Sequence, residues 1–109
     1  MIANAPGGEP LADLRHRLDD IDQRLLDALA ARLRAAAEVG ALKARLGVDA
    51  WDPAREAAIV RRAAASARAA GVPEEAVRHV FWTILGHCRE TVAAAGPSRP
   101  PTTASGAGA

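Results

Sequence analysis

Three cationic side chains have a type and spacing that could bind an anionic ligand. Arg32 interrupts a line of apolar residues that recur at alternating steps of three and four over residues 11–46. Lys43 follows eleven residues later, about three helical turns on and therefore on nearly the same face. Arg55 comes after a short break in the helical pattern. Burying unpaired cations is costly, so a site that keeps them is expected to hold an anion.

The expected anion is either a side chain or a small ligand. The candidate protein anions are Glu38, Asp52 and Glu56. More cations than anions in one pocket would suit a small dicarboxylate. The alternative is a set of internal salt bridges in a helical dimer, because a lone polar residue in a helical seam can simply set its register. The residues alone leave both interpretations open.

Other common catalytic arrangements are not found in the sequence. There is no glycine-rich phosphate loop, and three scattered serines make a serine–histidine triad implausible. The three histidines have no metal-ligand spacing with one another or with Cys88. Cys88 is the one cysteine, lies on an apolar line and is expected to be a core residue. We therefore expect no metal and no cofactor, and an enzyme that works by electrostatics and shape.

A very long helix must carry Arg32 and Lys43. The apolar spacing predicts a helix over residues 11–46, about 54 Å long, ended by Gly47 in a left-handed conformation. Such a helix is too long for a chain of 109 residues to cover in one ball, so we expect it to meet a partner. Its line consists of Leu11, Leu14, Leu18, Ile21, Leu25, Ala28, Arg32, Ala35, Val39, Leu42 and Leu46.

Two shorter helices follow. Asp52 and Pro53 predict an N-cap and a first helical position, and Gly71 predicts the end of this second helix. The third helix is expected from residues 72–75 to about Ala95. Its apolar line consists of Val77, Phe81, Ile84, Leu85, Cys88 and Val92. The prediction is an all-α fold of three helices in one domain over residues 11–95, with disordered tails at 1–10 and 96–109.

Composition limits the possible partners. The net charge of +1 lacks the basic excess of a nucleic-acid-binding domain. No signal peptide and no apolar stretch of membrane-spanning length are found, so we expect a cytoplasmic protein with no nucleic-acid or membrane partner. The apolar half of the chain is rich in alanine, with one Phe and two Trp. A core this thin favours oligomerisation.

Four motifs, in order, resemble the all-helical chorismate mutases. They are LxxLRxxLDxID at 11–22, LLDALAxR at 25–32, EVGxxK at 38–43 and DxxRE at 52–56. The resemblance implies an intertwined homodimer in which the long first helices of two subunits pair. It also implies the rearrangement of chorismate to prephenate, a small dicarboxylate substrate and product.

The resemblance implies a role for each matching residue. Arg15 would reach the partner's pocket, Arg32 and Arg55 would hold the substrate carboxylates, and Lys43 would contact a carboxylate and the ether oxygen. Two acidic residues, Asp52 and Glu56, would lie near the substrate hydroxyl. Among these, Lys43, Arg32 and Glu56 are the expected catalytic residues.

The third helix departs from the family's pattern. Val92 stands where the family usually has Gln or Glu facing the ether oxygen, and valine donates no hydrogen bond. Cys88 stands where a small polar residue is common. Three alternatives therefore remain: an isochorismate-pyruvate lyase, a 4-amino-4-deoxychorismate mutase, and a non-catalytic helical dimer. The cations argue against the last, because packing alone would favour an apolar residue in place of Arg32.

Overall fold

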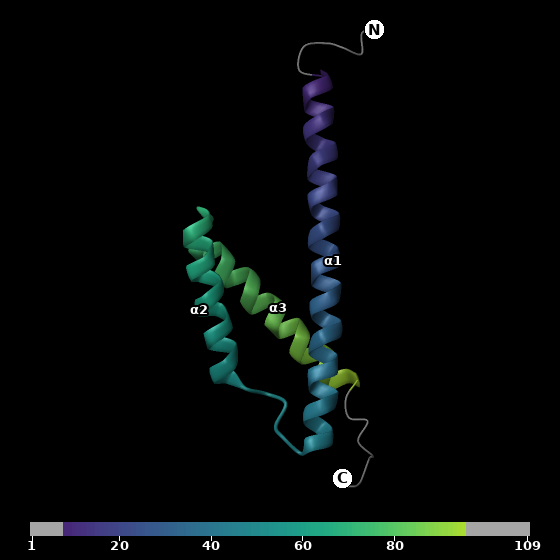
Figure 1. Ribbon diagram of the computed structural model, residues 1–109, viewed down its shortest axis with the longest axis vertical. Helices are drawn as coiled ribbons and strands as arrows, with labels where there is room; N and C mark the ends of the chain where they lie inside the picture. Colours follow the sequence, from purple (N-terminus) through teal and green to yellow (C-terminus); the bar gives the residue numbers. More distant parts are fainter. Residues whose placement is uncertain (1–7, 96–109) are drawn as a thin grey trace. The chain divides into compact units, whose positions relative to one another are not determined.

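The computed structural model describes residues 8–95, which form three α-helices and no strand (Figure 1). Helix α1 spans Gly8–Leu46, α2 spans Pro53–Ala70 and α3 spans Glu74–Ala95. The predicted all-α fold with a very long first helix is confirmed. None of these helices is long and apolar enough to cross a membrane. Most of both predicted tails, residues 1–7 and 96–109, lies outside the described residues.

Helix α1 begins three residues earlier than its apolar line predicts. Gly8, Glu9 and Pro10, which the sequence places in the tail, form its first turn. The first-turn N–H groups have no partner within a helix, so proline costs little there. Glu9 is also favoured by the helix dipole. The apolar periodicity could not reveal a turn that contains no apolar side chain.

The ends of α1 and α2 are built as predicted. Gly47 and Gly71 have φ angles of 71° and 74°, in the left-handed region that favours glycine. The N–H of Val48 bonds to the Lys43 carbonyl at 2.9 Å, and the N–H of Val72 bonds to the Ala67 carbonyl at 2.8 Å. Gly47 and Val48 therefore end α1 with a Schellman motif, and Gly71 and Val72 end α2 in the same way.

The turn between α2 and α3 also carries an ion pair. Arg68 Nε donates to Glu74 Oε2 at 2.5 Å, and this hydrogen bond lowers the pKa of the Glu74 carboxyl. Because the pKa of Glu74 is lower in the folded state, the ion pair stabilises the turn fully at pH values above the unfolded-state pKa. This stabilisation is lost as the pH falls through the folded-state pKa. Both side chains are partly exposed, so the contribution is small.

Helices α2 and α3 pack against each other. The buried side chains of this hairpin are Val60, Ala64, Ala67, Leu85 and Cys88. Alanines at a spacing of three to four let the two helices approach closely. No member of the predicted apolar line of α3 is exposed, and Cys88 is a core residue as expected.

The chain divides at Arg32–Leu33 into two units. In the first unit, described from Gly8, the apolar line of α1 faces outward: Leu14, Leu18 and Leu25 are 49%, 57% and 64% exposed. In the second unit the line continues exposed through Val39, Leu42 and Leu46. We call this line the seam of α1.

Within the second unit α1 packs by a different stripe. Gly40 is buried, and four further residues of the stripe are half-buried: Leu33, Ala36, Ala37 and Lys43. Gly40 is one residue, and therefore about 100°, around the helix from Val39 of the seam. Helix α1 thus has one face for its own chain and a neighbouring apolar face that the chain leaves exposed.

Candidate active site

An ion pair joins the first turn of α2 to α3. Arg89 Nη1 donates a short hydrogen bond to Glu56 Oε1, across 33 residues of sequence. The Glu56 side chain is only 14% exposed, whereas Arg89 is 44% exposed. Burying a carboxylate to this extent is costly without a cationic or hydrogen-bonding partner. Arg89 supplies that partner, and sequence reasoning missed it because nothing local links the two residues.

Gly40 of α1 and Val92 of α3 mark a second contact of the site. A β-carbon built on Gly40 would lie 2.7 Å from Val92 Cγ1 and 3.0 Å from Cγ2. Such distances are far inside van der Waals contact. Glycine within a helix costs about 1 kcal/mol relative to alanine, but at this position its lack of a side chain permits a close crossing of α1 and α3. Val92 takes part in this crossing.

Replacing Gly40 by alanine tests this crossing. Alanine gains about 1 kcal/mol of helix propensity, but overpacking against the stiff Val92 side chain costs about 1–3 kcal/mol. We expect Gly40→Ala to lower the free energy of unfolding by up to about 2 kcal/mol in urea titrations. In a Val92→Ala background, which lacks both methyl groups, the same change should stabilise the protein. An equal effect in both backgrounds would contradict the crossing.

The two contacts bring parts of all three helices together. Arg89 and Val92 are three residues apart, or about 4.5 Å along α3, and so are Gly40 and Lys43 along α1. The Lys43 segment of α1, the first turn of α2 and the last two turns of α3 therefore meet in one region of the second unit. Six of the eight predicted site residues lie in these segments or directly beside them: Lys43, Asp52, Arg55, Glu56, Cys88 and Val92.

Local contacts hold the polar residues of this region. Asp52 caps α2, because its Oδ1 accepts from the Arg55 backbone N–H at 3.0 Å. The half-buried Lys43 points its Nζ toward the Ala50 carbonyl at 3.5 Å. This is a long contact, and an ammonium has three donors, so Lys43 keeps donors for a ligand. The Arg55 side chain is exposed.

The first unit contains the remaining two predicted residues. Arg15 is exposed and Arg32 is half-buried. Their roles in the pocket stay predictions.

The charge of the region in the second unit suits an anion. The region contains three cations, Lys43, Arg55 and Arg89, and two carboxylates, Asp52 and Glu56. One carboxylate is engaged as a helix cap and the other by Arg89, so Lys43 and Arg55 remain available for acidic groups. Such a region can bind carboxylates and place a fixed ammonium donor beside a developing negative charge. Among residues 8–95 no cluster of three or more metal-binding side chains occurs.

The chain forms an all-helical fold in which a long helix is followed by an α-helical hairpin, and comparison with known proteins identifies its family. The family model described as chorismate mutase type II matches residues 14–92. A chorismate mutase of Methanocaldococcus jannaschii is 32% identical over 79 residues, covering 72% of this chain and 80% of that protein. The chain therefore belongs to the chorismate mutase type II family.

Two longer proteins are also similar. A T-protein of Enterobacter agglomerans is 39% identical over 75 residues, and one of Haemophilus influenzae is 32% identical over 73 residues. These alignments cover 69% and 67% of this chain but only 20% and 19% of the T-proteins. The chain thus spans about one fifth of their length. No significant match was found among solved structures.

Proposed function

We propose that this protein is a homodimeric chorismate mutase that rearranges chorismate to prephenate. The observation that carries the proposal is the family match over residues 14–92, which includes every residue of the predicted pocket. The name of the M. jannaschii relative supports the same activity. None of the comparisons favours the lyase or the aminochorismate mutase.

The reaction is unimolecular: one C–O bond breaks while one C–C bond forms. Its first requirement is that the flexible side chain of the substrate be held over the ring. Arg32 and Arg55 would do this by binding the two carboxylates, which converts binding energy into orientation. Only contacts that are stronger in the transition state accelerate the reaction.

The second requirement is a donor for the negative charge that develops on the ether oxygen. Lys43 would supply it, because its ammonium keeps free donors near the junction of the helices. Asp52 and Glu56 would lie near the substrate hydroxyl. Val92 offers no second donor.

The exposed seam of α1 supports the dimer. Leu14, Leu18 and Leu25 are largely exposed in the single chain, and burying a leucine is worth about 1.5–3 kcal/mol. A second copy would cover the seam with its own apolar surface, and Arg15, next to Leu14, would then reach the partner's pocket.

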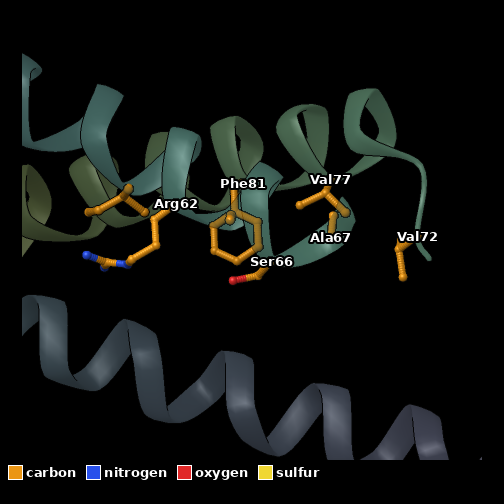
Figure 2. Close-up of a pocket in the computed structure, with 8 residues that line it drawn as sticks. Arg62, Ser66, Ala67, Val72, Val77 and Phe81 are labelled. Atoms are coloured by element: carbon orange, nitrogen blue, oxygen red, sulfur yellow. The ribbon is translucent and has the colours of Figure 1, made fainter. Parts of the chain in front are cut away.

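A hollow between α2 and α3 offers further apolar surface. Its volume is about 440 Å³, and its lining is mainly apolar, with Arg62 and Ser66 as polar members (Figure 2). Figure 2 shows Phe81 of α3 beside these two side chains of α2.

Restoring a donor on α3 should raise the rate. Val92→Gln adds an amide at the place where the family carries Gln or Glu, and one donor of this kind contributes about 100-fold or more to kcat. Glutamine has one γ-carbon where valine has two, so it does not add branching at the close approach of Gly40. We expect kcat for chorismate to rise about tenfold, measured by loss of chorismate absorbance; this is below the full donor effect because the site did not evolve around it. Val92→Met, which has similar length but no donor, should give no increase. An equal gain in both variants would show that packing rather than the donor is responsible.

The proposal is tested by product analysis with three substrates. The purified protein is incubated separately with chorismate, isochorismate and 4-amino-4-deoxychorismate. Prephenate from chorismate supports the mutase. Salicylate and pyruvate from isochorismate alone would assign a lyase, and turnover of the amino compound alone would assign an aminochorismate mutase. No turnover of any substrate would leave a non-catalytic dimer.

A further inference from the structure

Arg89 is a cation that the proposed mechanism does not use. It is one residue from the buried Cys88, and its guanidinium bonds to Glu56 of α2. None of the four sequence motifs contains it. Its charge nevertheless acts on the acidic residue that the proposed function places near the substrate hydroxyl.

The pair has a defined chemical character. An ionised carboxylate accepts hydrogen bonds and donates none, and a guanidinium only donates. One oxygen of Glu56, Oε1, is taken by Arg89, so the other oxygen remains as an acceptor. With both groups ionised the pair has no net charge. Because the free oxygen of Glu56 accepts hydrogen bonds, a substrate group that contacts it must be a hydrogen-bond donor. Because the pair has no net charge, it attracts a positively charged donor little more than a neutral donor.

We propose that Arg89 is a positioning and specificity residue: by neutralising and fixing Glu56, it favours a substrate with a neutral hydroxyl over one with an ammonium at the same place. This inference rests on the proposed function, which brings Glu56 to that group of the substrate. Without Arg89, Glu56 would carry an uncompensated negative charge at a site with 14% side-chain exposure. That charge would attract an ammonium more strongly, because partial burial weakens solvent screening.

The chain provides a matched set of variants. Arg89→Gln removes the charge but keeps a hydrogen-bonding side chain. Arg89→Lys keeps the charge. Arg78→Gln is the control, because Arg78 lies on the same helix, is 36% exposed and contacts Glu74 and Glu75 instead of Glu56.

The readout is the ratio of kcat/KM for 4-amino-4-deoxychorismate to that for chorismate. At about pH 6.5 an amino group with a pKa near that of an α-amino group is mostly protonated. We expect Arg89→Gln to raise this ratio about threefold to tenfold, which is the usual size of a single charge–charge interaction between partly exposed groups. Arg89→Lys should return most of the wild-type ratio, and Arg78→Gln should not change it. A purely structural role would lower both rates together, and an unchanged ratio would overturn the proposal.

A second measurement separates this proposal from the proposed function. A double-mutant cycle of Glu56→Gln and Arg89→Gln, followed by urea unfolding, measures the pair without any substrate. Coupling between the two changes is expected, and strict additivity would overturn the pairing. If the cycle shows coupling but the wild-type protein turns over neither substrate, the proposed function is overturned, and the proposed specificity with it. Turnover with an unchanged ratio would overturn only the role of Arg89.

Discussion

Replacing Lys43 by alanine is expected to lower kcat for chorismate by about 100-fold to 1000-fold, the usual effect of removing one donor from a developing oxyanion. Lys43 is half-buried at the junction of the helices and contacts only the Ala50 carbonyl among the hydrogen bonds described for it. Its ammonium is the group that the proposal assigns to the ether oxygen. Steady-state rates of chorismate loss give the measurement.

The control for Lys43 is another cation at the end of α1. Arg45 lies in the same last turn and is exposed, so Arg45→Ala changes the charge without touching the proposed site. It should keep near-full activity. Both variants should melt at similar temperatures, because neither side chain contributes to the buried core. If Lys43→Ala retained near-full activity, the assignment of the ether-oxygen donor would be wrong.

Replacing Leu25 by aspartate is expected to dissociate the dimer and abolish most activity. In a lone chain the change should be mild, because Leu25 is 64% exposed. In the proposed dimer it would bury a carboxylate in an apolar seam, which is strongly unfavourable without a partner charge. We expect the dimer to weaken at least 100-fold, measured by sedimentation equilibrium. Activity should fall with it, since Arg15 of one copy would serve the pocket of the other.

The neighbouring residue provides the control for this change. Arg24→Asp introduces the same side chain one position away, on the polar face of α1. It carries a similar helix-propensity cost but should leave the dimer intact. Equal oligomeric states for Leu25→Asp and the wild type would show that the seam is not an interface.

The helix ends and the apolar line of α3 could be predicted from the sequence because their signals are local. Gly47 and Gly71 adopt left-handed φ angles, and Asp52 caps α2. Each of these depends on residue type and a few neighbours. Arg32 could be singled out in the same way, because a charge within an apolar line is visible without knowledge of the fold; its role in the pocket stays a prediction.

The tertiary contacts of the site could not be predicted in this way. Glu56 and Arg89 are 33 residues apart, and Arg89 falls outside every motif. From sequence alone a glycine within a helix indicates only a cost of about 1 kcal/mol, whereas the lack of a side chain at Gly40 permits the crossing with Val92. Apolar spacing also identified the seam of α1 but not the neighbouring stripe through Gly40, because that stripe contains Lys43 and three small residues beside its one large apolar residue, Leu33.

The most direct test of the proposed function follows the conversion of chorismate by proton NMR with the wild type and with Arg32→Ala. The wild type should convert chorismate to prephenate with no other product and no added cofactor. Arg32→Ala should remain folded but lose most of this activity, because one carboxylate anchor is gone. Unchanged chorismate with folded wild-type protein, or equal conversion by both proteins, would contradict a mutase that works through this set of cations.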